Sequence, residues 1–413
     1  MKLLHTADWH LGRILYGRSM LEDQRYFIHS FLFPLIDREK PDALLLSGDI
    51  FDRQIAPVEA IRLFDDFVTG LCVDRQIPLV AIAGNHDGAD RLGLGARLYR
   101  AAGFYLTARL DPDAPPVKFP DQDREVHIYS LPYFDPATAR DCLSDPSIRG
   151  CGDAFAAVLD RLRQRLDPAA CNILLAHCFV TGAAVSDSES PLFIGGSGEV
   201  DAGLFQDFDY VALGHLHRAQ RAGEDGVRYA GSPLKYSFDE ENHHKSVTIL
   251  EIGQGLSVRQ VPVKPLRDMR TVTGSLDQLR TQALAPENRL GREDYIYAVL
   301  SGPPVFEPMS RLREFYPNAL GVINGADPAA GETAERSALR RNLRRRDSMT
   351  LFEEFLRQMC DTEPTEDDRA VFQEIGGALL GSGQPADDTG PADAQADFFR
   401  PTGSRPETTE EGK

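Results

Sequence analysis

The feature that most constrains this chain is a short apolar run that ends in two histidines. Residues 211–217 read Val-Ala-Leu-Gly-His-Leu-His, so a buried strand followed by Gly214 would put His215 and His217 together at its end. Histidine is the commonest metal-binding side chain. Taken alone, the stretch would fit two exposed histidines in a turn better, because a single short motif is only a hypothesis.

The same pattern recurs in four other apolar runs, each of which passes through a small residue into Asp, Asn or His. Continuous apolar runs of this length are typical of strands buried on both faces. Five such strands indicate one shared site at their carboxyl ends, where open α/β sheets bind their ligands. The candidate ligands are Asp8, His10, Asp49, Asn85, His177, His215 and His217.

Segments with helical spacing of apolar residues separate the first strands, at 28–36 and at 57–71. This alternation of strand and helix indicates βαβ units and therefore an α/β fold. Farther along the chain, three apolar runs at 227–229, 246–252 and 256–263 are predicted to close a second sheet.

The pattern changes near Pro265, where a second domain is expected to begin. The first domain would then span 1–264, and a small α+β domain without a ligand cluster would span 265–330. Its predicted elements are a strand, a helix, a strand, a helix and a strand, at 269–272, 276–284, 295–300, 309–315 and 320–323.

The residues after 330 are expected to form a linker, a docking element for a partner protein and a tail. Arginines cluster in a basic linker at 331–347, which fits either a solvated helix or a contact with phosphate or a partner. Two short amphipathic helices over 348–380 cannot bury their own apolar faces, so they are predicted to dock on a partner, the alternative being packing on their own chain. The composition of 381–413 favours a disordered acidic tail.

The net charge, the cysteines and the lengths of the apolar runs limit the classes of protein to which the chain can belong. The net charge of −18 argues against a protein that grips DNA unaided, because phosphate contacts need Lys and Arg. The cysteines form no C-x-x-C pair and no signal-peptide pattern opens the chain, so we expect reduced thiols in the cytoplasm. No apolar run approaches the ~20 residues that span a bilayer, so no membrane association is expected.

The number and type of candidate ligands favour a two-metal centre. Seven donors exceed what one divalent ion usually accepts, whereas two ions about 3.5–4 Å apart, bridged by Asp49, would use them all. Carboxylate, amide and imidazole donors without thiolate favour Mn²⁺, with Fe or Zn as alternatives. A structural zinc site would usually include Cys. Cys178, beside His177, is expected to fill the core.

Two further residues are candidates for catalysis. His86 directly follows a candidate ligand, so it can face the substrate without binding metal, and we assign it to protonating the leaving oxygen or stabilising the transition state. Asp52 lies one helical turn after Asp49 and would either orient the His86 ring or cap a helix. Trp9 stands between two candidate ligands and is expected to pack in the core.

Five motifs occur together in the chain: Asp8-x-His10, Gly48-Asp49-x-x-Asp52, Gly84-Asn85-His86-Asp87, Ala176-His177 and Gly214-His215-x-His217. In combination they resemble the calcineurin-type metallophosphoesterases. Longer stretches at 4–12, 187–192 and 208–217 resemble the nuclease subunits of bacterial SbcCD exonucleases, which are relatives of the Mre-type double-strand-break nucleases. The resemblance covers about residues 1–376.

The resemblance implies a β-sandwich flanked by helices, a DNA-capping domain at 265–330, and C-terminal helices that bind an SMC-like ATPase of the SbcC type. It implies a double-strand exonuclease and single-strand or hairpin endonuclease in DNA repair, recombination and replication, as a homodimer within a heterotetramer. One metal ion would be held by Asp8, His10, Asp49 and His217. The other would be held by Asp49, Asn85, His177 and His215.

Two other interpretations stay open. One is a phosphoesterase of the same fold that acts on small nucleotides or on proteins. The sequence Gly-Asn-His-Asp at 84–87 counts against a protein phosphatase, and the extra domain counts against a compact cyclic-nucleotide enzyme. The other is a non-catalytic scaffold for the ATPase, which would have no need of a complete ligand set.

Overall fold

The computed structural model describes residues 1–121, 124–186, 188–189, 198–223, 225–253, 255–289, 291–324, 365 and 369. Residues 1–327 form one compact unit, and the second unit, 328–413, contains only two of the described residues. The predicted basic linker, docking helices and acidic tail therefore lie outside the described residues, apart from Thr365 and Arg369.

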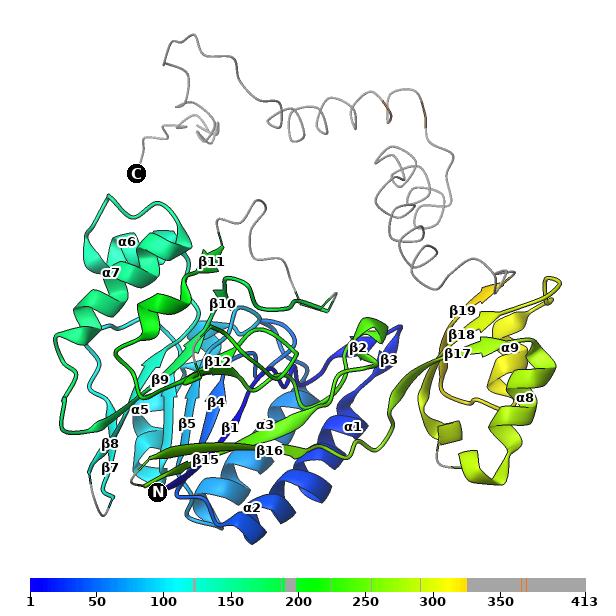
Figure 1. Ribbon diagram of the computed structural model, residues 1–413, viewed down its shortest axis with the longest axis horizontal. Coiled ribbons are helices and arrows are strands. Elements are labelled where there is room, and N and C mark those ends of the chain that lie inside the picture. The colour runs from blue at the N-terminus through cyan, green and yellow to red at the C-terminus, as the bar shows by residue number, and fades with distance from the viewer. Residues whose placement is uncertain are drawn as a thin grey trace, which may run out of the picture. The chain divides into compact units, whose positions relative to one another are not determined.

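Two six-stranded sheets pack face to face (Figure 1). The first contains, in spatial order, β16 (Leu256–Pro262), β15 (Ser246–Ile252), β1 (Lys2–Thr6), β4 (Ala43–Ser47), β5 (Leu79–Ile82) and β6 (Phe104–Thr107). The second contains β13 (Gln220–Arg221), β14 (Val227–Tyr229), β12 (Tyr210–Gly214), β9 (Cys171–His177), β8 (Val126–Leu131) and β7 (Val117–Phe119). The predicted α/β sandwich is confirmed.

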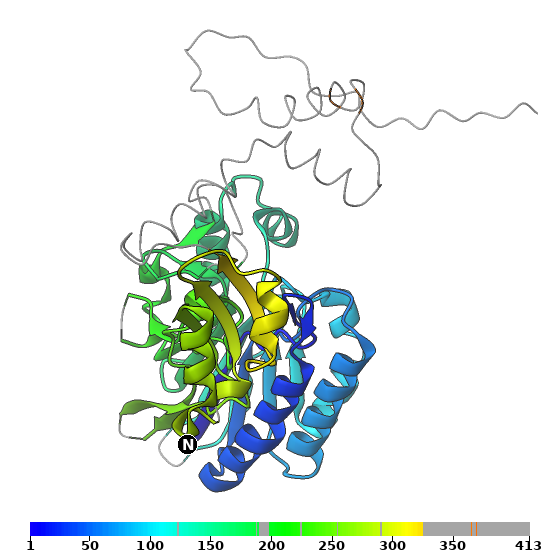
Figure 2. The same cartoon turned by 90° about the vertical axis from the view of Figure 1, so that its right-hand side faces the viewer.

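Helices cover the outer face of each sheet, as Figures 1 and 2 show. Two continuous helical stretches lie over the first sheet. One consists of α1 (Leu21–Tyr26), the π-helix η1 (Phe27–Leu32) and α2 (Phe33–Glu39), and the other of α3 (Val58–Val68) and the π-helix η2 (Thr69–Val73). The second sheet is covered by α6 (Pro136–Leu143) and α7 (Cys151–Arg163). None of the helices among the described residues is both long and apolar enough to cross a membrane.

Shorter elements complete this part of the chain. The strands β2 (Ile14–Leu15) and β3 (Arg18–Ser19) form a hairpin, and β10 (Phe179–Val180) pairs with β11 (Glu199–Val200). The remaining helices are α4 (Ala89–Leu92), α5 (Ala96–Tyr99) and the 3₁₀ turns η3 (Arg100–Ala102), η4 (Ala202–Phe205) and η5 (Phe238–Glu240).

Alternation along the central strands explains why the runs are apolar throughout. Successive side chains of a strand point to opposite faces of its sheet. Leu4 and Leu44 pack under the helices, whereas Leu3 and Leu45 pack between the two sheets. Both faces of the strand are therefore buried, as the continuous apolar pattern predicts.

The prediction that residues 246–252 and 256–263 close a second sheet is wrong. β15 pairs antiparallel with β1 in the first sheet, and β16 extends that edge. Only β14, at 227–229, joins the second sheet. β15 suits its place because Val247 and Ile249 point to the helix layer while Leu250 points between the sheets. This is the same two-sided burial that β1 shows.

The residues after Pro265 form a separate three-stranded parallel sheet with its own apolar cluster. The predicted order of strand, helix, strand, helix and strand is confirmed. The elements are β17 (Met269–Gly274), α8 (Leu276–Leu284), the 3₁₀ turns η6 (Pro286–Asn288) and η7 (Gly291–Glu293), β18 (Tyr295–Leu300), α9 (Pro308–Arg313) and β19 (Ala319–Asn324).

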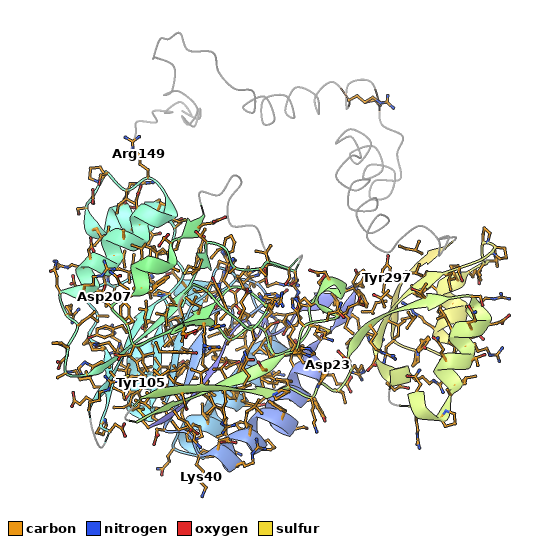
Figure 3. All side chains as sticks on the ribbon, in the orientation of Figure 1. Asp23, Lys40, Tyr105, Arg149, Asp207 and Tyr297 are labelled. Carbon is orange, nitrogen blue, oxygen red and sulfur yellow. The ribbon has the colours of Figure 1, made fainter. Side chains whose placement is uncertain are left out.

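A buried carboxylate on α1 joins this small sheet to the sandwich. Asp23, labelled in Figure 3, accepts a hydrogen bond of 2.7 Å from the hydroxyl of Tyr295 and one of 3.0 Å from Nη1 of Arg267. Burial raises the pKa of Asp23 above its ordinary value. Met20 and Met269 pack beside the group. The joint thus combines apolar packing with a partly compensated buried charge.

We predict that Tyr295→Phe lowers the free energy of unfolding by about 1–3 kcal/mol, because a buried carboxylate then loses a hydrogen bond. Urea unfolding measures the change. Tyr105→Phe on β6 is the matched control, since the Tyr105 hydroxyl makes no hydrogen bond within the described part of the chain. Equal stability of the two variants would contradict the role given to this joint.

Candidate metal centre

Five parallel strands from both sheets end at the same place. β1, β4 and β5 run parallel in the first sheet, and β9 runs parallel to β12 in the second. The two sheets meet closely there: a Cβ atom on Gly214 would lie 1.8 Å from the carbonyl oxygen of Ser47. A Cβ atom on Gly48, whose φ is +87°, would lie 2.4 Å from Nδ1 of His177. Only glycine fits these two positions.

The first group of candidate ligands gathers around one oxygen of Asp49. Nε2 of His10 lies 3.6 Å from Oδ2 of Asp49. The same nitrogen lies 3.0 Å from Nε2 of His217. Two imidazole nitrogens that face each other at this distance are arranged to share one cation. His86 also lies within reach of this group.

The second group shares Asp49 from the other side. Nε2 of His177 lies 3.5 Å from Oδ2 of Asp49 and 2.9 Å from Oδ1 of Asn85. Nδ1 of His215 lies 3.2 Å from the same oxygen of Asn85. Asp8 lies within reach of Asp49 and His177, although the family resemblance assigns it to the ion of His10 and His217. The structure thus brings all seven predicted ligands together, and Asp49 is common to both groups.

The protonation states suit cation binding. Burial lowers the pKa of His10 well below its ordinary value and lowers that of His215 to about 3, so both rings are neutral and keep a free lone pair. Burial alone would also lower the pKa of His177, but the carboxylates of Asp49 and Asp8 outweigh it and raise that pKa to about 9. Without an ion, His177 therefore carries a positive charge that partly balances the two acids, and a metal ion would bind in place of the proton on Nε2.

One buried oxygen indicates that the cluster is built for a cation. Oδ2 of Asp8 is buried and has no hydrogen-bond partner among the described residues, while Oδ1 accepts the main-chain N–H of His215 at 2.8 Å. Burial raises the pKa of Asp8 well above its ordinary value. An unpartnered buried carboxylate oxygen is costly unless an ion takes it up. The donors therefore fit a divalent metal centre.

His86 is held beside these groups by the main chain. Its Nδ1 donates to the carbonyl oxygen of Asp52 at 2.8 Å, and its main-chain N–H donates to Oδ1 of Asp49 at 2.9 Å. The bond to the carbonyl occupies Nδ1 and leaves Nε2 to face the substrate side of the ring. The His86 ring lies edge-on to that of His10, with centroids 4.7 Å apart.

Asp52 contacts the His86 ring, one of the two roles expected for it, but not through its side chain. It holds the His86 ring through its main-chain carbonyl, not through its carboxylate. The carboxylate instead accepts a hydrogen bond of 2.9 Å from Arg13 and lies 3.8 Å from Nδ1 of His10. It caps no helix, because the next helix, α3, begins only at Val58.

The two residues expected to pack in the core do so. Trp9 is buried, donates to the Thr6 hydroxyl, and packs edge-on against Phe27 and Phe67. Cys178 lies in the apolar cluster beneath the second sheet.

Two residues that no sequence pattern marks as functional hold the loops of the site. The carboxylate of Asp87 accepts the main-chain N–H groups of Gly84, Ile50 and Phe51, and so ties together the loops after β4 and β5. Nε2 of Gln24 donates to the carbonyl oxygen of His10 at 2.8 Å. Only the place of Asp87 inside a motif could have identified it, because the partners of Asp87 and most of those of Gln24 are main-chain atoms.

A second set of missed residues surrounds His217. Ser188, Glu189, Glu240 and Lys245 all contact this residue. Burial alone would raise the pKa of Glu240, but Lys245 and the hydrogen bond with His217 outweigh burial and hold that pKa well below its usual range. Glu240 is thus an ionised carboxylate directly behind a candidate ligand.

Comparisons with known proteins identify relatives of the chain. The family model for calcineurin-like phosphoesterases matches residues 1–219, and the model for the type 5 capsule protein repressor C-terminal domain matches residues 265–359. The chain is 32% identical over 364 residues to the D subunit of the SbcCD nuclease of Staphylococcus epidermidis, a match that covers 87% of this chain and 94% of that protein.

Two crystal structures resemble parts of the chain more distantly. A dimetal phosphatase from Danio rerio is 14% identical, covers 64% of this chain and 98% of its own, and has a TM-score of 0.40. A hypothetical protein from Pyrococcus horikoshii is 13% identical, covers 64% of this chain and 88% of its own, and has a TM-score of 0.28.

We predict that Mn²⁺ raises the melting temperature of chelator-treated protein, because an ion that binds only the folded state stabilises it by about 2.7 kcal/mol at 100 times its Kd. Asp49→Asn should remove most of the shift, since Asp49 belongs to both groups. Asp23→Asn changes another buried carboxylate and should keep the shift. A full Mn²⁺ response from Asp49→Asn would show that the ions bind elsewhere.

Proposed function

The chain belongs to the calcineurin-like phosphoesterases and, within them, to the family of SbcCD nuclease subunits, and we propose that it is the nuclease subunit of an SbcCD-type complex. The observation that carries the proposal is the convergence of carboxylate, amide and imidazole donors around Asp49. The substrate is the phosphodiester backbone of DNA, cut from double-strand ends and within hairpins or single strands. Such cutting serves DNA repair, recombination and replication.

The metal centre takes two divalent ions, most favourably Mn²⁺, because its donors include no thiolate. One ion is held by Asp8, His10, Asp49 and His217. The other is held by Asp49, Asn85, His177 and His215. The position of Asp49 in both groups of donors supports its role as the bridge.

When bound, a pair of divalent ions lowers the pKa of water and neutralises the charge on a phosphodiester. The chain's own contribution to proton transfer is His86. The Asp52 carbonyl accepts a hydrogen bond from its Nδ1–H, so in the protonated ring the second N–H, on Nε2, can donate its proton to the leaving oxygen and leave a neutral imidazole. Arg13 holds the carboxylate of Asp52 and thereby steadies the turn that supplies this carbonyl.

The proposed partners are DNA and an SMC-like ATPase. The chain's net charge of −18 supports a partner that supplies basic surface for DNA. We propose that the helices predicted at 348–380 dock on this ATPase. We also propose a division into a nuclease domain at 1–264 and a DNA-capping domain at 265–330. The separate sheet β17–β19 and its own apolar cluster support that division.

An apolar patch on the outer helices supports a homodimer within a heterotetramer. We define this patch as Val58 and Ile61 on α3 together with Leu94 and Leu98 at α4–α5, all of which are exposed. The two segments are neighbours, because Phe64 of α3 and Tyr99 of α5 both pack on the same phenylalanine of β6. Leu94 and Leu98 are 78% and 79% exposed, so pairing with a second copy would remove a large apolar surface from water.

We predict that His86→Asn keeps both metal ions and DNA binding but lowers turnover by about 10²- to 10⁴-fold, the usual contribution of general acid catalysis. Cleavage of labelled duplex and hairpin DNA with Mn²⁺, with and without the ATPase, measures the effect. His29→Asn, an exposed histidine outside the site, is the control.

Loss of metal from His86→Asn would make His86 a ligand. Wild-type protein that cleaves small phosphodiesters but no DNA, even with the ATPase, would overturn the nuclease proposal.

We predict that Leu94→Glu/Leu98→Glu converts a dimer into a 45.7 kDa monomer, because charges cannot be buried across an apolar interface without partners. Light scattering coupled to size-exclusion chromatography measures the mass. Phe306→Glu replaces another exposed apolar residue, outside the patch, and should leave the dimer intact. A dimer that survives the double substitution would place the interface elsewhere.

A further inference from the structure

The ring of His217 is held from behind by a carboxylate and a hydroxyl. Its Nδ1 lies 2.7 Å from Oγ of Ser188 and 3.2 Å from Oε1 of Glu240. The Ser188 hydroxyl in turn donates to the same oxygen of Glu240. Both acceptors favour a proton on Nδ1, and this is the tautomer of a neutral ring whose Nε2 has the lone pair for a metal ion. That lone pair faces His10 and the metal centre.

The main chain of the same residue is also held by side chains. Oε1 of Glu189 accepts the His217 N–H at 2.5 Å. Nζ of Lys245 donates to the His217 carbonyl oxygen at 2.8 Å, to Oγ of Ser232 at 2.8 Å, and to Glu240. Glu240 is 0% and Lys245 8% exposed, so their ion pair is buried.

Within the described part of the chain, the support of the other candidate ligands is weaker, because the Asp52 carboxylate behind Nδ1 of His10 lies 3.8 Å away and makes no hydrogen bond to it. Nδ1 of His177 donates to the main-chain carbonyl of Ser47 at 2.8 Å. His215 is held at its N–H by Asp8, itself a candidate ligand. Of the two proposed metal positions, the one with His217 therefore depends on an ion pair that takes no direct part in binding.

From this asymmetry we infer that Ser188, Glu189, Glu240 and Lys245 are positioning residues that set the affinity of one metal ion, the one bound by His217. The inference rests on the proposed two-metal function. Partners behind a ligating histidine fix its tautomer and ring orientation, and their loss typically weakens metal affinity by about 10- to 100-fold. This gives a role to Ser188 and Glu189, which belong to the motif at 187–192. The proposed nuclease reaction assigns no role to that motif.

Two double variants test the inference without leaving a buried charge unpaired. Glu240→Leu/Lys245→Met removes both charges and one of the two acceptors of the His217 ring. Glu240→Gln/Lys245→Met removes both charges but keeps an acceptor oxygen. Replacing both members of a buried ion pair is often tolerated, whereas replacing one is not. Lys235→Met is the matched control, because this lysine pairs with Asp268 and contacts no candidate ligand among the described residues.

The readouts are Mn²⁺ stoichiometry and affinity, measured by equilibrium dialysis, and the electron paramagnetic resonance spectrum. We expect the Leu/Met variant to bind one ion as tightly as wild type and the second about 10- to 100-fold more weakly. At limiting Mn²⁺ its spectrum should change from that of a coupled pair to the six-line spectrum of an isolated ion. The Mn²⁺ affinities of the Gln/Met variant should lie closer to those of wild type. Those of Lys235→Met should equal the wild-type values.

Three results would overturn the inference. Wild-type affinity for both ions in the Leu/Met variant would make the network a structural ion pair only. Equal loss of affinity for both ions, or equal affinities in the two double variants, would show that the network does not act specifically through the His217 ring. Wild-type protein that binds two ions but cuts no DNA would instead count against the proposed function and leave this inference intact.

Discussion

Gly214 and the carbonyl oxygen of Ser47 approach so closely that no side chain can stand between them, and the rest of the site depends on this contact. It joins the end of β12 in one sheet to the end of β4 in the other. The adjacent contact of Gly48 with His177 fixes β9 in the same way. Donors from two different sheets can therefore reach one small volume. A glycine precedes the donors after each of β4, β5 and β12 for the same reason, because no side chain fits at these positions.

Such packing creates an electrostatic problem that a cation solves. Asp8, Asp49 and the ring of His177 are all buried, and burying charges is costly unless they are paired. His177 with Asp49 makes one pair, while His10 and His215 stay neutral. The second oxygen of Asp8 keeps no partner among the described residues. Metal binding and the stability of this part of the fold are thus linked through the same atoms.

The site also depends on the length of the chain. His10 meets His217 across 207 positions of sequence, and the carboxylate behind His217 comes later still, at position 240. β15, which borders β1, follows directly after Lys245. The metal centre therefore cannot form from the βαβ units alone. It is complete only when the later strands close the edge of the first sheet and bring the Glu240–Lys245 pair beneath the histidine.

The sequence by itself determined the ligand types, the strands that end in them, and the order of elements in the small domain. It did so because burial on both faces demands continuous apolar runs and because donors follow those runs directly. Only the tertiary structure decided that β15 and β16 join the first sheet, since an apolar run does not specify which strand it pairs with. It alone decided that Asp52 holds His86 through a carbonyl, which every residue possesses. The same applies to Ser188, Glu240 and Lys245: their partners lie far away in sequence, and no local pattern marks a residue that acts on a distant histidine.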